Sequence, residues 1–149
     1  MWSPACHNRA MARRSRKPQQ PRSAPRQCPC GSGRAYAECC GPLHAGEGRA
    51  ASAEALMRSR YSAFALGDVP YLLRTWHPDT RPGELELDGT RIWTGLEILA
   101  TTGGSAFHTE GTVEFRAGFR DVDGPGVQSE TSFFHRVDGA WLYHSGETD

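Results

Sequence analysis

The first long pattern of apolar and polar positions has the period of an α-helix. Met57, Tyr61 and Phe64 recur at spacings of four and three residues, which places them on one helix face. A serine just before this run is a favourable N-cap, and a glycine just after it is a favourable stop. The pattern therefore predicts a helix over about residues 53–66. Asp68 can cap a second, shorter helix to about residue 76, which the proline at position 78 ends.

Beyond about residue 91 the apolar positions alternate instead, with the period of a β-strand. The alternating sets are Ile92, Thr94, Leu96 and Ile98 in one strand and Val113, Phe115, Ala117 and Phe119 in the next. The segment 123–126 is typical of a turn, 128–137 of a further strand, and Asp138-Gly139 of a hairpin before a return strand over 140–145. Because helices precede an antiparallel meander, the predicted class is α+β.

The 149-residue chain has no net charge, but its charges are unevenly distributed. Residues 1–27 hold seven basic residues and no acidic one, whereas residues 28–149 hold ten basic and 17 acidic residues. The first segment is rich in Pro, Ser and Gln and has no apolar period, so we expect a disordered basic tail over 1–27. A small knuckle over 28–48 and a globular domain over 49–149 are expected to follow.

The tail could contact the phosphates of RNA, the ribosome or anionic lipids through charge alone. It carries no aromatic residue among its basic ones, so we expect no sequence-specific nucleic-acid binding. No stretch reaches the roughly 18 apolar residues of a membrane helix, and the N-terminus lacks the apolar core of a secretory signal. We therefore expect a cytoplasmic protein with no membrane span. Thiols stay reduced there, which favours metal binding over disulfides.

Four of the five cysteines are clustered within 13 residues. They are Cys28, Cys30, Cys39 and Cys40. Zinc takes four thiolate or imidazole ligands in a tetrahedron, which two facing pairs can supply. Gly31 and Gly33 allow a tight turn after the first pair, and residues 34–38 can form a helical turn that delivers the second. Four protein ligands leave no open position, so the expected zinc is structural rather than catalytic.

Alternatives stay open at this point. The cluster could be redox-active or incidental, and His44 could replace Cys40 as the fourth ligand. Cys6 and His7 lie in the tail and are expected to bind nothing. The knuckle has no apolar core, and small residues connect it to the first helix. We therefore expect a semi-independent appendage that depends on the metal, behind which the α+β body folds by itself.

The cysteine segment resembles the SEC-C motif, the zinc knuckle of the bacterial protein-export motor, with Cys40 standing where the motor has histidine. Further segments resemble the YchJ family of bacterial proteins. They are CCGPLHAG at 39–46, ALMRSRYSAF at 55–64, YLLRTWHP at 71–78 and VEFRA at 113–117. This resemblance implies an NTF2-like cone, in which helices pack on a curved antiparallel sheet. It also implies a protein-interaction module, linked to chaperone, export or ribosome-associated proteins through the knuckle.

The sequence departs from the family pattern in two places. Longer members carry a second SEC-C knuckle at the C-terminus, and this sequence shows none. The His-Glu pair that the family has in its third long strand is Ser129-Glu130 here. Any role for the family's histidine therefore does not carry over to this chain.

NTF2-like cones often enclose a pocket, so an isomerase- or hydratase-type enzyme or a small-molecule binder is the alternative function. The candidate pocket residues are Tyr61, Trp76, His77, Trp93 and His135, with His108 and His144 as further histidines. His135 shares a strand face with Phe133 and Val137, which would point it inward, where a histidine beside an acid could act as a general base. No phosphate loop, nucleophile elbow or HExxH motif is present, so no catalytic residue is assigned.

Arg58 and Arg60 lie two positions apart and should point to different sides of the first helix. For each of them a salt bridge or solvent exposure is expected, with an anion site as the alternative.

Overall fold

The longest helix has the bounds that its pattern predicts. The computed structural model describes residues 26–148, and α3 spans Ala53–Leu66 within them. The hydroxyl of Ser52 accepts a hydrogen bond from the Ala55 amide at 3.1 Å, and Gly67 ends the helix with φ of 80°. The predicted stripe of Met57, Tyr61 and Phe64 is buried. Local capping and one apolar face thus explain this element.

Three shorter helical segments surround α3. They are η1 (Tyr36–Glu38), α2 (Cys40–His44) and α4 (Val69–Arg74). Asp68 caps α4 by accepting a hydrogen bond from the Tyr71 amide at 3.1 Å, as predicted, although α4 ends two residues before the predicted position. In residues 26–148 no helix is long and apolar enough to cross a membrane.

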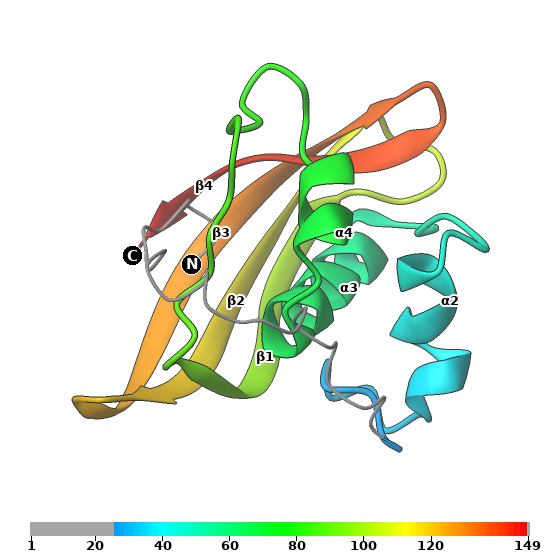
Figure 1. Cartoon of the computed structure of the whole chain (residues 1–149). Coiled ribbons are helices and arrows are strands. Elements are labelled where there is room, and N and C mark those ends of the chain that lie inside the picture. The colour runs from blue at the N-terminus through cyan, green and yellow to red at the C-terminus, as the bar shows by residue number, and fades with distance from the viewer. Residues whose placement is uncertain (1–25, 149) are drawn as a thin grey trace.

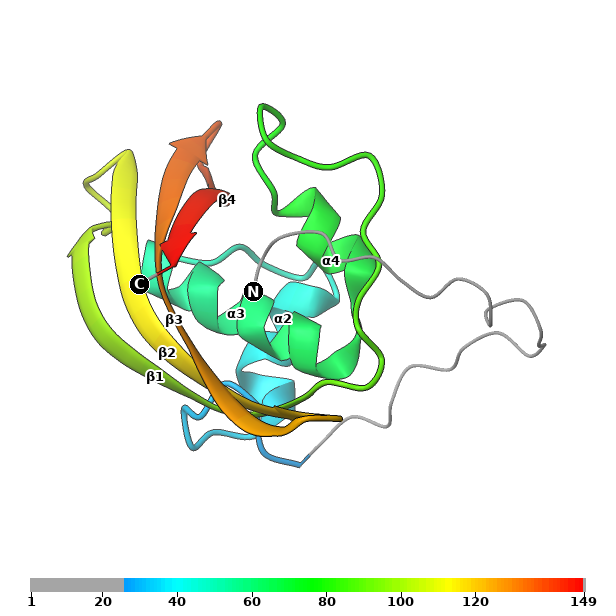
Figure 2. The same ribbon diagram turned by 90° about the vertical axis from the view of Figure 1, so that its left-hand side faces the viewer.

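The second half of the chain forms a four-stranded antiparallel sheet in the order β1-β2-β3-β4. The strands are β1 (Ile92–Gly103), β2 (Glu110–Asp121), β3 (Gly124–Val137) and β4 (Ala140–Thr148). The sheet curves around α3, and α4 lies on the same concave side (Figures 1 and 2). Helices on the inside of a curved antiparallel meander confirm the predicted α+β class and the cone-like arrangement.

β3 begins four residues earlier than predicted. The turn is Val122-Asp123 rather than 123–126, because Gly124 already pairs with Asp121. Pro125 pairs with Arg120 of β2, and β4 joins β3 only from Glu130 onward. This end of β3 therefore has a free edge, where a proline that lacks an N–H costs no ladder hydrogen bond.

β1 does not keep the strict alternation that its apolar residues suggest. A bulge between Trp93 and Gly95 shifts the register, so that Trp93 and Leu96 are partly buried while Ile92 is 55% exposed. In β2 the alternation holds, and Val113 and Phe115 are buried. An extra residue in one strand reverses which side chains face the core, and apolar spacing alone does not reveal it.

The edge of β4 is extended by one further short pairing. Trp76 forms an isolated parallel bridge with Tyr143, and the Tyr143 carbonyl accepts a hydrogen bond from the His77 amide at 2.7 Å. The loop after α4 is thereby fixed to the sheet. Trp76 and Tyr143 pack edge to face on the buried side, with ring centroids 5.2 Å apart.

Arg60 is buried inside the cone, which contradicts the expectation of solvent exposure. Its guanidinium donates at 2.8 Å to the Leu72 carbonyl and the Thr75 hydroxyl, and it lies 4.6 Å from the ring centroid of Tyr143. Burial lowers the pKa of Arg60 to about 10. Arg58 forms the expected salt bridge, with Glu54 at 3.1 Å, on another side of α3.

Candidate metal centre

The four clustered cysteines converge on one point in the structure. Their sulfur atoms all lie within 4.8 Å of one another, and those of Cys30 and Cys39 are 3.6 Å apart. All four are free thiols. In a tetrahedral zinc–thiolate site the sulfurs are about 3.8 Å apart, given bonds of about 2.3 Å. The donor set therefore fits one thiolate-bound metal ion.

The backbone of the knuckle, here residues 26–48, explains why the sulfurs meet. Gly31 and Gly33 have φ of 83° and 84°, the left-handed turn conformation for which the sequence provides glycine. The Cys28 amide donates to the Arg34 carbonyl at 2.9 Å, and η1 then delivers the second pair of cysteines. At Gly41 a Cβ atom would lie 2.7 Å from the Tyr36 carbonyl oxygen, which is too close, so the approach of α2 to η1 requires glycine there.

The knuckle starts earlier than the predicted boundary at residue 28. Gln27 forms an antiparallel bridge with Ala35, and the carbonyl of Arg26 accepts a hydrogen bond from the Tyr36 amide at 3.1 Å. The remainder of the predicted tail, with Cys6 and His7, lies outside the described residues.

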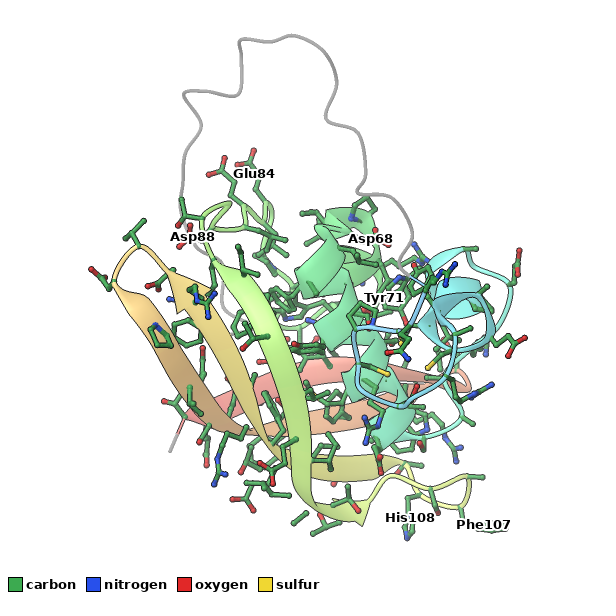
Figure 3. All side chains as sticks on the ribbon, turned by 90° about the horizontal axis from the view of Figure 1, so that it is seen from below. Asp68, Tyr71, Glu84, Asp88, Phe107 and His108 are labelled. Atoms are coloured by element: carbon green, nitrogen blue, oxygen red, sulfur yellow. The ribbon has the colours of Figure 1, made fainter. Side chains whose placement is uncertain are left out.

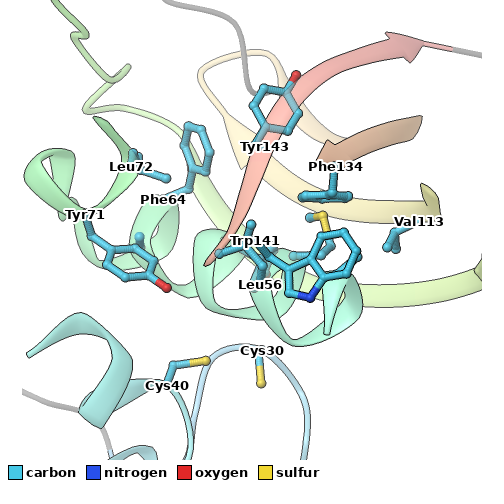
Figure 4. Packing of buried hydrophobic residues seen from close by; sticks show 14 of the residues in the cluster. Cys30, Cys40, Leu56, Phe64, Tyr71, Leu72, Val113, Phe134, Trp141 and Tyr143 are labelled. Atoms are coloured by element: carbon cyan, nitrogen blue, oxygen red, sulfur yellow. The ribbon is translucent and has the colours of Figure 1, made fainter. Parts of the chain in front are cut away.

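The cysteine cluster is anchored on α3, which corrects the expectation of a semi-independent appendage. Cys28, Cys30 and Cys40 belong to the same buried cluster as the α3 side chains, and Figure 4 shows Cys30 and Cys40 close to that helix. The hydroxyl of Ser62 lies 3.5 Å from the Cys28 sulfur and 3.4 Å from the Cys40 sulfur. Arg58 of α3 donates to the Cys30 carbonyl at 2.9 Å. Only the Cys39 side of the cluster is partly exposed.

His44 is tied into the protein through both ring nitrogens. Its Nε2 lies 2.8 Å from the Ser59 carbonyl and must donate to it, so Nδ1 accepts from the Tyr36 hydroxyl at 2.7 Å. Burial raises the pKa of Tyr36 to about 12, so its hydroxyl is protonated and able to donate at neutral pH. This arrangement argues against His44 as a metal ligand and makes it a second anchor between α2 and α3.

The thiols also compete with one another for protons. Hydrogen bonds from the Cys30 and Cys40 thiols lower the pKa of Cys28. The same contacts with Cys28 raise the pKa of Cys30 and of Cys40. A shared ion that attracts all four thiolates resolves this competition, as is usual for clustered cysteine ligands.

The structure does not bring the five candidate pocket residues together. Tyr61 and Trp93 meet edge to face at 6.2 Å, and Trp76 is buried beneath the Arg60 guanidinium. His77 and His135 contact each other, with ring centroids 5.7 Å apart. In the described part of the cone, these residues form separate aromatic contacts rather than one catalytic constellation.

The predicted inward direction of His135 is wrong. Ser132 and Phe134 are the buried residues of this part of β3, so His135 lies on the opposite, outer face of the sheet. Two adjacent phenylalanines make the apolar alternation compatible with either register. Pairing of Phe134 with Tyr143 across β3 and β4 decides between them.

Sequence reasoning missed the polar residues of α3 that hold the knuckle. Ser59 and Ser62 are fully buried and lie three residues apart, on one helix face. The Ser59 hydroxyl is also hydrogen-bonded to the Tyr71 hydroxyl of α4, at 2.7 Å. Two small polar residues within a helix that is otherwise buried are a signal for close contact with a neighbouring segment.

A hollow of about 290 Å³ lies beside the knuckle. Its walls come from α2 and the connector after it, from α3 and α4, and from the start of β4. Leu43, Trp141 and Leu142 provide apolar surface, and Arg49 and Arg74 provide positive charge. This hollow is therefore both apolar and cationic.

Comparisons with known proteins agree with this architecture. The model of the YchJ middle NTF2-like domain matches residues 52–146, and that of the SEC-C motif matches residues 27–42. A UPF0225 protein of Streptomyces coelicolor is 60% identical over 80% of this chain and 94% of its own length.

Two solved structures of SEC-C motif containing proteins are also similar. The solution structure from Rhodopseudomonas palustris has a TM-score of 0.72 and 37% identity, and covers 82% of this chain and 98% of its own. The crystal structure from Psychrobacter arcticus has a TM-score of 0.68 and 28% identity, covering 85% and 84%. The chain therefore belongs to the family that combines a SEC-C motif with the YchJ middle NTF2-like domain and whose relatives are called UPF0225 proteins.

Proposed function

We propose that the four cysteines hold one structural zinc ion and that the knuckle serves as a protein-interaction module. The observation that carries the zinc assignment is the convergence of four thiols within 4.8 Å. An all-sulfur tetrahedral set suits zinc, and four protein ligands leave no position for a substrate. Cys28, Cys30, Cys39 and Cys40 would each donate one thiolate.

The interaction role is supported by what the knuckle exposes. One side of it is anchored on α3, whereas residues 31–35 are exposed. The hollow beside it combines apolar walls with two arginines. Such a surface suits a partner segment in which an apolar side chain lies next to a carboxylate. Partners among chaperone, export or ribosome-associated proteins would follow the resemblance to the SEC-C motif.

The metal assignment is tested on the purified full chain. Elemental analysis should find one zinc per chain, and X-ray absorption should find a first shell of sulfur only. His44→Ala should retain that zinc, because both ring nitrogens of His44 are used within the protein. Iron with an iron–sulfur spectrum, or substoichiometric metal after zinc-replete expression, would contradict the proposal.

The interaction role is tested by affinity capture from native lysate with quantitative mass spectrometry. Wild type is compared with Arg49→Glu, which reverses the charge at the hollow, and with Arg116→Glu as the matched control. Arg116 is exposed on β2, forms an ion pair with Glu97 and does not line the hollow. A specific partner should be lost with Arg49→Glu and kept with Arg116→Glu. Equal capture by both variants would argue against the hollow as the docking surface.

A further inference from the structure

A second group of metal-ligating side chains lies on the outer face of the sheet. It consists of His77, Asp79 and His144, with one ligand atom of each within 4.8 Å of the others. His77 follows the bridge to β4, and His144 lies in β4 itself. The pairing of residues 75–77 with the edge of β4 therefore brings His77 and Asp79 next to His144, which is far from them in sequence.

The histidine cluster, meaning His77, Asp79, His144 and the adjacent His135, is held in a defined geometry. The rings of His135 and His144 stack with centroids 4.7 Å apart, and His77 and His144 meet edge to face at 5.1 Å. The Thr80 hydroxyl donates to the His144 carbonyl at 2.7 Å, which ties the loop to β4. The histidine rings are therefore positioned before any ligand arrives, which lowers the cost of binding.

The hydrogen bond of His144 to its neighbour leaves one of its nitrogens available to a metal, whereas His77 would exchange a contact. His144 Nδ1 lies 3.1 Å from the Ser145 hydroxyl, which can accept its proton, so that Nε2 carries the lone pair. His77 Nδ1 accepts a hydrogen bond from the Asp79 amide at 3.0 Å and lies 3.8 Å from the Asp79 carboxylate. A metal at His77 Nδ1 would replace that amide contact. Asp79 has a side chain that is 76% exposed and can adjust.

We infer that His77, Asp79 and His144 form a second metal site, which takes a borderline divalent transition-metal ion such as Zn²⁺. Two imidazoles and one carboxylate favour such ions over Mg²⁺ or Ca²⁺, which prefer oxygen ligands. Three protein ligands leave at least one position open to water, unlike the closed set of the cysteine cluster. His135 orients the His144 ring by stacking and is a positioning residue. The site is independent of the zinc proposed for the knuckle.

The test uses calorimetric titration of Zn²⁺ into the full chain that already holds one zinc per chain. One further equivalent should bind. His144→Ala removes one ligand and Asp79→Asn removes the negative charge of another, so each should weaken that event by at least about tenfold. His108→Ala is the control, because His108, labelled in Figure 3, lies in the β1–β2 loop, contacts Ser105 through Nδ1 and is not one of the three grouped ligands. The double variant Cys6→Ser/His7→Ala should keep the second event.

A second readout keeps the inference falsifiable if a variant folds poorly. In the wild type, Zn²⁺ should shift the side-chain ¹⁵N resonances of His77 and His144 to values of metal-bound nitrogen, and leave those of His108 unchanged. Absence of a second equivalent would overturn the inference. So would its persistence in Asp79→Asn and His144→Ala, or its loss in Cys6→Ser/His7→Ala.

Discussion

The cysteine cluster and the histidine cluster gather their donors in opposite ways. Three of the four cysteines are buried and share the hydrophobic core with α3, whereas Asp79 is exposed and the histidines line the outer face of the sheet. The cysteines come from 13 consecutive residues, but His77 and His144 are far apart in sequence. The ligands of the cysteine cluster therefore also form part of the hydrophobic core, whereas the ligands of the histidine cluster are held at the surface by the fold.

This difference has an energetic consequence. With the proposed metal, we expect order in the knuckle to depend on bonds to its sulfurs, because the knuckle contributes little apolar surface of its own. The contacts of Cys28 with Ser62 and of His44 with the Ser59 carbonyl link the knuckle to α3, so an ordered knuckle should also stabilise α3. His135 and His144 lie on strands whose stability comes from the core on the opposite face, and His77 lies in the loop fixed to β4. Loss of cysteine ligands should therefore destabilise the protein, whereas loss of histidine-cluster ligands should change mainly the binding of metal.

The largest effect is expected from the double change Cys39→Ser/Cys40→Ser. It should abolish zinc binding and lower the free energy of unfolding by more than about 4 kcal/mol, because metal bonds and core packing are lost together. Hydrogen exchange should also accelerate in the part of α3 that holds Ser59 and Ser62. Cys6→Ser is the control that leaves the cluster intact. Full protection of α3 in the double variant would show that the knuckle is separable after all.

A smaller loss is expected from His44→Ala, which breaks an anchor without touching a sulfur. It leaves the Ser59 carbonyl and the Tyr36 hydroxyl without their partner. Denaturant unfolding should show a loss of about 1–3 kcal/mol for this group of buried hydrogen bonds. Zinc content should stay at one per chain. Loss of the metal together with stability would instead assign His44 to the metal site.

A pH effect of modest size should come from His144. Burial, followed by the neighbouring His135 and His77, lowers its pKa below the ordinary 6.5. The unfolded chain then binds a proton more readily than the folded one, so stability should decrease as pH falls from 6.5 toward the folded pKa. Thermal melts of wild type and His144→Ala between pH 7.5 and 5 would measure it. The variant should lose less stability on acidification, and identical slopes would contradict the expectation.

The smallest effect on stability is expected from Asp79→Asn. The side chain is exposed and its backbone contacts are kept, so the free energy of unfolding should change by no more than about 0.5 kcal/mol. Zn²⁺ affinity of the outer site should nevertheless fall. A large destabilisation would show that Asp79 supports the fold of the loop, and the contrast between the two clusters would weaken.

Features that depend on neighbours in sequence could be predicted well. Ser52, Gly67 and the apolar stripe define α3 within its own length, and both cap contacts are local. The turn that brings the sulfurs together is likewise local, because Gly31 and Gly33 lie between the two cysteine pairs. In each case the relevant interactions span only a few residues, so the local pattern carries the information.

Side-chain directions in the sheet could not be predicted from local pattern. The bulge in β1 and the early start of β3 are properties of strand pairs, and the adjacent Phe133 and Phe134 allow either register for His135. Burial of Arg60 likewise requires partners from α4 and β4. These outcomes depend on which distant segments pair, which a single strand or helix does not specify.

The sequence by itself determined the helix over 53–66, the order of helices and strands, and a cysteine set with the spacing of a metal knuckle. Only the tertiary structure decided that the knuckle is anchored on α3 and that His77 and His144 meet on the outer face of the sheet. The physical reason is the range of the interactions. Caps and turn glycines act over a few residues, whereas docking and cross-strand contacts exist only once the sheet has closed around α3.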